Sequence, residues 1–280
     1  MKFAKMHGLG NDYVYVNAFE EQVSDPPALA VAVSDRHFGI GSDGLVLVAP
    51  STVADFRMEM YNADGSRAEM CGNASRCVGK YVYEHGMTRR TQITLETDAG
   101  IKSLRLTLEG DKVSRVRVDM GEPVTECDRV PCLLGSGVVT QCSIRALDRT
   151  FAITPVSMGN PHGVIFLSEP VETFDVRRYG PVLEQHPAFP EKVNIEFVNV
   201  LSPGRLCMRV WERGSGVTLA CGTGACATLV AASLCGLAQR RATVVLDGGE
   251  LDIEWNEASG HVYMTGPAAH VFDGEYDAKG

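Results

Sequence analysis

The sequence has little that suits a nucleic acid or a membrane as its main partner. Its 26 Lys and Arg residues are outnumbered by 35 Asp and Glu residues, which gives a formal net charge of −9. Nucleic acids and anionic membranes both require basic patches. The most apolar stretch, Ala225–Ala238, contains Thr228, Ser233 and Gly236 and is too short to cross a bilayer. Residues 1–8 lack the apolar segment of a secretory signal, so we expect a soluble, cytoplasmic protein.

The nine cysteines include no Cys-x-x-Cys pair. This absence weakens zinc-ribbon and thioredoxin-like interpretations. Disulfide frameworks are typical of small secreted domains, whereas this chain has 280 residues, so we predict free thiols. A free cysteine is often a small buried hydrophobe, and we expect most of the nine to be that.

Two segments of the chain repeat each other. Residues 58–73 read MEMYNADGSRAEMCGN, and residues 208–223, at a shift of 150, read MRVWERGSGVTLACGT. Residues 10–16 correspond to residues 159–166 at a shift of 149. Chance similarity between Gly-rich turns could explain one such match, but it explains two matches in the same order far less readily. The length also allows two domains. We therefore predict a duplicated unit, forming two similar domains related by a pseudo-twofold axis.

Strand patterns dominate the chain. Alternating or β-branched segments occur at Phe56–Tyr61, Gln92–Thr97, Ser103–Leu108, Val113–Met120, Cys142–Leu147, Phe151–Val156, Leu206–Trp211, Ala242–Leu246 and Leu251–Trp255. Helical candidates are Pro27–His37, Asn73–His85, Val176–His186 and Thr223–Leu234. This order predicts an α+β fold with a mixed sheet wrapped on a central helix in each half. We expect domains at 1–120 and 121–267, with the tail 268–280 packing back on the first.

Cys71 and Cys221 occupy equivalent positions in the repeat, each between a strand and turn and a predicted helix. Backbone N–H groups and the macrodipole at a helix N-terminus favour a thiolate and lower its pKa. Each cysteine is followed by a glycine, and Asn73 and Thr223 suit the N-cap position. The same N–H groups can hold a substrate carboxylate. A purely structural role as buried core thiols would account less well for the glycine and the polar residue that follow each of the two cysteines.

A symmetric pair of thiols suits the inversion of a carbon stereocentre. One thiolate removes an α-proton while the other thiol delivers a proton to the opposite face, and the roles exchange in the reverse reaction. Helix N-termini would stabilise the enolate-like charge that develops. The chain has no obvious lysine motif for pyridoxal phosphate.

Five motifs, in order and covering nearly the whole chain, resemble those of the diaminopimelate epimerase family. They are residues 8–12 (GLGND), 62–66 (NADGS) with 71–73 (CGN), 158–162 (MGNPH), 212–214 (ERG) and 220–226 (ACGTGAC). The resemblance implies two similar α/β domains with the site in the cleft between them. It implies a cofactor-independent isomerase, without a metal, that interconverts LL- and meso-2,6-diaminopimelate for lysine and cell-wall peptide synthesis. It also implies a homodimer.

The resemblance also implies roles for single residues. Cys71 and Cys221 would be the acid/base pair, and His162 and Glu212 would tune it. The residues expected to bind substrate are Asn11, Asn62, Gly72, Asn73, Asn160, Asn194, Glu212, Arg213, Gly222 and Thr223.

The chemistry of these side chains agrees with a zwitterionic substrate. Arg213 suits a carboxylate, Glu212 suits an ammonium group, and an asparagine offers both a donor and an acceptor. An asparagine beside glycine is equally a turn residue, and His162 after Asn-Pro equally suits a turn or packing. Two positions depart from relatives: Gly44 replaces a substrate-contacting glutamine, and Val217 replaces a glutamate.

Two other functions compete with this interpretation. The first is a racemase of the same architecture acting on proline, hydroxyproline or another small acid. It is less favoured, because Glu212, Arg213 and the several asparagines suit a substrate with a second zwitterionic end. A thiol redox or metal-binding protein fits poorly, because five residues separate Cys71 from Cys77 and four separate Cys221 from Cys226. Oxidation joining Cys71 to Cys221 would inactivate the enzyme.

Overall fold

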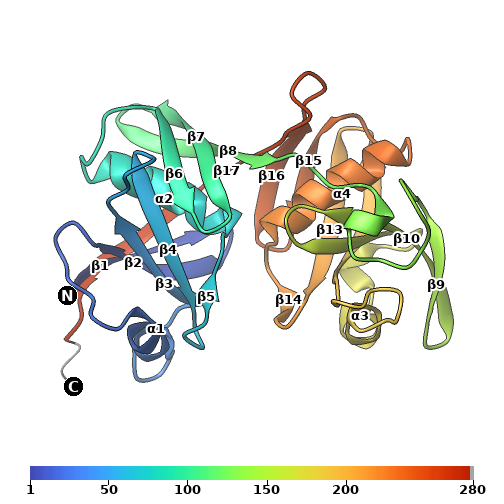
Figure 1. The fold of residues 1–280 in the computed structure, drawn as a ribbon, viewed down its shortest axis with the longest axis horizontal. Coiled ribbons are helices and arrows are strands. Elements are labelled where there is room, and N and C mark those ends of the chain that lie inside the picture. The colour runs from blue at the N-terminus through green and yellow to red at the C-terminus, as the bar shows by residue number, and fades with distance from the viewer. Residues whose placement is uncertain (278–280) are drawn as a thin grey trace. The chain divides into compact units, whose positions relative to one another are not determined.

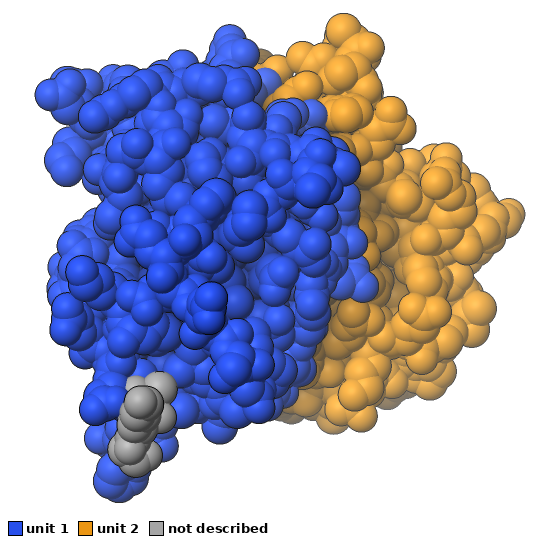
Figure 2. All heavy atoms as spheres, turned by 60° about the vertical axis from the view of Figure 1, so that its left-hand side comes forward, with its two compact units in different colours: residues 1–119, 265–280 blue, residues 120–264 orange. Residues whose placement is uncertain are grey.

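The computed structural model describes residues 1–277, so residues 278–280 of the expected C-terminal tail lie outside the described part. The chain divides into two compact units (Figure 2). The first unit comprises Met1–Asp119 and the chain from Thr265 onward, and the second unit comprises Met120–Met264. Each unit is mixed α/β with the same order of elements, which confirms the predicted fold class (Figure 1).

The first unit is built from nine strands and two helices within the described residues. These are β1 (Lys2–Gly8), β2 (Asn11–Asn17), α1 (Pro26–Ser34), β3 (Gly44–Ala49), β4 (Phe56–Asn62), β5 (Arg67–Ala68), α2 (Gly72–Glu84), β6 (Gln92–Thr97), β7 (Gly100–Glu109), β8 (Lys112–Gly121) and β18 (Ala269–Glu275). The last strand, β18, pairs antiparallel with β1, so both ends of the chain build this unit.

The second unit repeats the arrangement, with two 3₁₀ turns added. Its elements are η1 (Cys127–Arg129), β9 (Cys142–Ala146), β10 (Arg149–Ser157), β11 (Pro161–Phe166), η2 (Val171–Thr173), α3 (Val176–Glu184), β12 (Asn194–Ser202), β13 (Arg205–Glu212), β14 (Gly216–Thr218), α4 (Gly222–Leu234), β15 (Arg241–Leu246), β16 (Gly249–Trp255) and β17 (Val262–Gly266).

The pairing of strands confirms the duplication. In the first unit β2 pairs parallel with β3, β3 antiparallel with β4, and β4 parallel with β6. In the second unit β11 pairs parallel with β12, β12 antiparallel with β13, and β13 parallel with β15. Gly10 and Gly159, matched by the repeat, precede β2 and β11 with φ values of 87° and 96°, a region in which only glycine is unstrained. The sequence match therefore reflects a repeated backbone.

All four predicted helices are present, each within a few residues of its expected bounds. The C-cap residue of α2 and that of α4 are each followed by a glycine at the C′ position. Both glycines have the positive φ that this position favours, 74° at Gly86 and 69° at Gly236. In the second unit α4 packs against β10, β11, β12, β13, β15 and β16, and α3 packs against β12, β13 and β14. The strands thus enclose the long apolar helix, as Figure 1 shows.

Aromatic rings fill the core beneath α3. Phe197 of β12 is fully buried, with its ring centroid 4.6 Å from that of Phe174 and 6.3 Å from that of Phe151. Tyr179 of α3 lies edge-on to Phe151 at 5.2 Å. Such edge-on and tilted pairs are favourable beyond the apolar area that they bury. This cluster fixes β12, which carries residues of the site described below.

The prediction that the cysteines are free is wrong for two of them. Cys127 and Cys132 form a disulfide across the η1 turn, and the five-residue separation brings their Cα atoms to 5.4 Å. The expectation rested on chain size and compartment, which carry no information about such a local turn. Among residues 1–277, no helix is long and apolar enough to cross a membrane.

Replacing Phe197 by alanine should lower the free energy of unfolding by about 3–5 kcal/mol, because it removes a fully buried ring and leaves a cavity. Both tryptophans, Trp211 and Trp255, lie in the second unit, so their fluorescence during urea denaturation reports that unit. Val200→Ala, at the exposed end of the same strand, is the matched control and should change stability by less than about 0.5 kcal/mol. Equal effects of the two substitutions would contradict this account of the core.

Candidate active site

Cys71 is the residue from which α2 begins. It occupies the N-cap position in extended conformation, with φ −138° and ψ 121°, and is partly buried. Its Sγ lies 3.4 Å from Oδ1 of Asn11, the first residue of β2. Asn73, in the first turn of α2, donates through Nδ2 to the same Asn11 oxygen over 3.3 Å. The first unit therefore gathers three of the predicted site residues around one sulfur.

Cys221 begins α4 in the same way. It is the N-cap residue, extended and buried, and its Sγ accepts a hydrogen bond from the backbone N–H of Gly224 at 3.4 Å. The Thr223 hydroxyl lies 3.5 Å from the same sulfur. The prediction that Asn73 and Thr223 are N-caps is wrong, because the extended cysteine itself precedes the first helical residue in both helices.

The predicted carboxylate-binding residues all lie in the first turns of two 13-residue helices. Gly72 and Asn73 open α2, and Gly222 and Thr223 open α4. The first N–H groups of a helix have no intrahelical acceptor and carry the positive end of the macrodipole. Each unit therefore places a thiol beside the first N–H groups of a helix.

The electrostatic setting of Cys221 differs from the sequence expectation. Burial raises the pKa of this thiol well above its ordinary value, and the negative charges of Glu212 and Glu196 raise it further. Hydrogen bonds from Thr223 and from the Gly224 amide act in the opposite direction and are outweighed. The expectation that a helix N-terminus lowers this pKa is therefore wrong for Cys221, where the net direction favours the neutral thiol.

A buried pair of ionisable groups lies behind this thiol. His162 on β11 and Glu196 on β12 are both fully buried, with His162 Nδ1 2.7 Å from Glu196 Oε1. His162 Nε2 lies 3.0 Å from Oδ1 of Asn160. A Cβ on Gly224 would meet Glu196 Oε1 at 2.8 Å and Cys221 Sγ at 3.2 Å, so the carboxylate and the sulfur flank the same point of α4.

Sequence reasoning placed His162 and Asn160 in the site but missed Glu196. One signal was available: Glu196 is the single charged residue in the apolar segment Asn194–Val198. A buried charge requires a partner, and here His162 supplies it.

Glu212, at the end of β13, lies close enough to both His162 and Cys221 to interact with them. Burial raises the pKa of its carboxyl, while a hydrogen bond from Thr218, the charge of His162 and a hydrogen bond from Cys221 oppose the rise. The structure thus brings Glu212, His162 and Cys221 together, as the sequence predicted.

The side chains of three further predicted residues form hydrogen bonds with groups of their own unit. Asn194 donates to the carbonyl of Pro161 at 2.9 Å and accepts from the backbone N–H of Arg213 at 2.8 Å, so it positions the start of that loop. The Arg213 side chain is exposed and donates to the carbonyl of Glu191 at 2.9 Å. Asn62 donates to the Ser66 hydroxyl at 2.9 Å, which fits a turn role.

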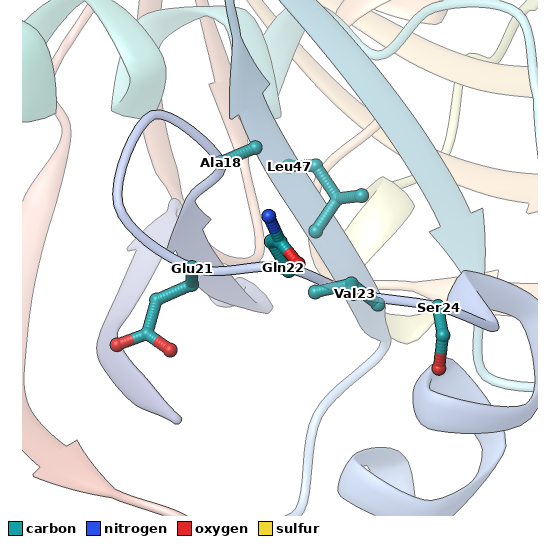
Figure 3. Close-up of a pocket in the computed structure, with 6 residues that line it drawn as sticks. All are labelled: Ala18, Glu21, Gln22, Val23, Ser24 and Leu47. Atoms are coloured by element: carbon teal, nitrogen blue, oxygen red, sulfur yellow. The ribbon is translucent and has the colours of Figure 1, made fainter.

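A pocket of the first unit lies away from these groups (Figure 3). Its lining contains none of the predicted site residues and a single charged side chain, and comprises Ala18, Glu21, Gln22, Val23, Ser24 and Leu47. It offers no cation for a substrate carboxylate, so the helix-start thiols remain the better candidate for the site.

Comparison with solved structures defines the class of the fold. The chain is similar to a hydroxyproline epimerase from Agrobacterium vitis with a TM-score of 0.71, at 16% identity, over 98% of this chain and 90% of that one. The architecture is accordingly the proline racemase-like epimerase fold.

Sequence comparison gives the family. The family model described as diaminopimelate epimerase matches residues 3–126 and 154–271. A diaminopimelate epimerase of Acetivibrio thermocellus is 56% identical over 277 residues, 99% of each chain. One of Methanococcus maripaludis strain C6 is also 56% identical, over 99% of this chain and all of its own. The chain belongs to the diaminopimelate epimerase family, as the motifs predicted.

Glu212→Gln should lower the pKa of Cys221 by about one unit or more, because it removes a neighbouring negative charge that disfavours the thiolate. Titration of the cysteine ¹³Cβ resonances between pH 7 and 11 measures each thiol separately. Glu172→Gln is the matched control: Glu172 lies beside Cys207, whose pKa is raised to about 11 by burial and by this carboxylate, so it should lower the pKa of Cys207 alone. An unmoved Cys221 in Glu212→Gln would contradict the electrostatic account.

Proposed function

We propose that the protein interconverts LL- and meso-2,6-diaminopimelate by a two-base thiol mechanism without an organic cofactor or metal. Membership of the family supports the reaction. The observation that carries the mechanism is the equivalence of Cys71 and Cys221, each the N-cap of the long helix in its own copy of a duplicated unit.

The reaction needs one proton removed and one delivered. A thiolate takes the α-proton, the electron pair of the broken C–H bond is delocalised onto the oxygens of the adjacent carboxylate as an enolate-like anion, and a thiol protonates the opposite face of the α-carbon. The enzyme is left with the thiol and thiolate exchanged, ready for the reverse reaction. The raised pKa of Cys221 favours its thiol form, which supports its role as the donor in the direction in which Cys71 is the base.

The first turns of α2 and α4 would hold the reacting carboxylate. Their N–H groups, at Gly72, Asn73, Gly222 and Thr223, donate hydrogen bonds that strengthen as charge moves onto the carboxylate oxygens. Small or short side chains at these positions let the substrate approach the backbone closely.

The remaining polar residues would recognise the amino groups and the distal, non-reacting centre. Arg213 would bind the distal carboxylate and Glu212 an ammonium group. The asparagines would complete the set through both ends of their amides, and they are Asn11, Asn62, Asn160 and Asn194. His162 and Glu212 would tune the thiol of Cys221, since the charge of Glu212 acts on that thiol and the charge of His162 acts on Glu212.

The wider setting follows from the same family. The substrate is a small zwitterion, so neither nucleic acid nor membrane is required as a partner. We propose a cytoplasmic homodimer supplying lysine and peptidoglycan synthesis, with the acidic surface consistent with such a role.

Cys71→Ser and Cys221→Ser should each lower the rate of epimerisation by more than about 100-fold, because each removes one of the two acid–base groups. Incubation with LL-diaminopimelate in D₂O, followed by chiral chromatography and mass spectrometry, measures meso product and α-deuterium. Cys142→Ser, a partly exposed thiol on β9, is the matched control and should retain full activity. A fully active Cys71→Ser or Cys221→Ser enzyme, or a requirement for added pyridoxal phosphate, would refute the mechanism.

A further inference from the structure

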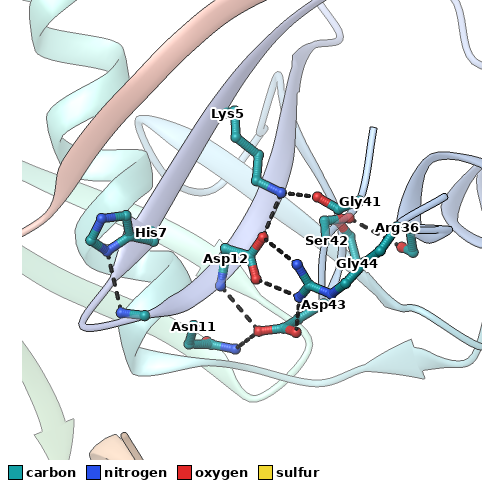
Figure 4. Close-up of polar contacts among 11 residues, drawn as sticks. Lys5, His7, Asn11, Asp12, Arg36, Gly41, Ser42, Asp43 and Gly44 are labelled. Atoms are coloured by element: carbon teal, nitrogen blue, oxygen red, sulfur yellow. Dashed lines mark hydrogen bonds and ion pairs between the residues drawn. The ribbon is translucent and has the colours of Figure 1, made fainter. Parts of the chain in front are cut away.

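The carboxylate of Asp43 lies beside the amide group of Asn11 (Figure 4). Its Oδ2 accepts hydrogen bonds from Asn11 Nδ2 at 2.9 Å and from the backbone N–H of Asp12 at 3.1 Å. Its Oδ1 lies 3.0 Å from Arg36 Nη2. An ion-paired carboxylate is ionised and offers only acceptor atoms.

This acceptor dictates which way the Asn11 amide turns. An asparagine side chain has a donor end and an acceptor end that exchange places on a half-turn. Because Asp43 accepts only, the NH₂ of Asn11 faces Asp43 and the carbonyl Oδ1 faces Cys71 Sγ, 3.4 Å away. The Nδ2 group of Asn73 donates to the same Oδ1 and reinforces this orientation.

A carbonyl oxygen beside the sulfur acts on its protonation. A thiol S–H can donate to that oxygen, whereas a thiolate would face it with like partial charge. A hydrogen bond made by the neutral form disfavours ionisation. The opposite amide orientation would present an NH₂ group and favour the thiolate.

We propose that Asp43 is a positioning residue for Cys71: by fixing the amide of Asn11, it presents a carbonyl oxygen to the sulfur and holds the thiol against premature ionisation at the start of α2. The catalytic meaning of this control rests on the function proposed above. A group that alternates between acid and base must release its proton as readily as it takes one, and the Asn11 oxygen offsets the pull of the helix N-terminus on Cys71.

The surrounding ion pairs keep Asp43 in place. Asp12 bonds to Lys5, which is almost completely buried, and to Arg36, which also bonds to Asp43 (Figure 4). The pKa of Asp12 is lowered by these two cations. The backbone N–H of Asp12 is thereby a fixed donor, and it requires an acceptor at the position of Asp43 Oδ2.

Two substitutions at Asp43 separate amide orientation from charge. Asp43→Ala and Asp43→Asn remove the same negative charge, but asparagine retains an oxygen acceptor, which the Asp12 N–H orients toward Asn11. Alkylation of the full-length, substrate-free protein by iodoacetamide as a function of pH, read at the Cys71 peptide by mass spectrometry, gives the midpoint of thiol ionisation. We expect this midpoint to fall in Asp43→Ala by about half a pH unit or more below that in Asp43→Asn, the value of one hydrogen bond.

The controls lie in the same chain. Cys142, partly exposed in the second unit, is read in the same digest and should not shift. Asp98→Ala removes a similarly exposed carboxylate that is ion-paired with an arginine, Arg67, and should leave the Cys71 midpoint unchanged. Thermal denaturation should give similar transitions for both Asp43 variants.

Equal midpoints in Asp43→Ala and Asp43→Asn would overturn the proposal, since the effect would then belong to charge alone. An unchanged or higher midpoint in Asp43→Ala would overturn it as well. The test is independent of the reaction: failure of the wild-type protein to epimerise diaminopimelate would refute the proposed function and leave the titration interpretable. Full epimerase activity with no difference between the two variants would refute the role of Asp43 alone.

Discussion

The start of one helix in each unit is the constraint on which the site depends. A helix leaves its first N–H groups without intrahelical acceptors, and in α2 and α4 the residue at this point is a cysteine in extended conformation. The strand and turn before each cysteine deliver the chain at the required angle, and the enclosing strands bury the rest of the helix. The thiol and the first N–H groups of the helix therefore come from a single local geometry.

The duplicated backbone does not produce duplicated electrostatics. Burial and the negative charges of Glu212 and Glu196 raise the pKa of the Cys221 thiol. Glu196 is itself paired with His162. Cys71 is partly exposed, and its Sγ lies beside the amide oxygen of Asn11, to which Asn73 also donates. The two sulfurs thus have different neighbours: carboxylates act on Cys221, and an amide oxygen lies beside Cys71.

The sequence predicted those features that are encoded within a short segment. The cysteines, the four helices and the glycines that end α2 and α4 all follow from local patterns, and the repeat supported each prediction twice. Glu196 and Asp43 were missed because their partners lie on other elements. Glu196 reaches His162 across the parallel pair β11–β12, where the register sets Asn194 opposite His162. Asp43 reaches Asn11 over 32 positions of sequence. The roles assigned to substrate-binding residues remain predictions.

The two ends of the chain meet in one unit, and this has a consequence for synthesis on the ribosome. Lys2–Gly8 pairs with Ala269–Glu275, and the terminal amine of Met1 bonds to the carbonyl of Tyr276 at 2.9 Å. The second unit is one continuous segment, and all of it is translated before Ala269–Glu275. The first unit is therefore the later of the two to be completed, and a chain ending before Ala269 would have a complete second unit and a first unit without β18.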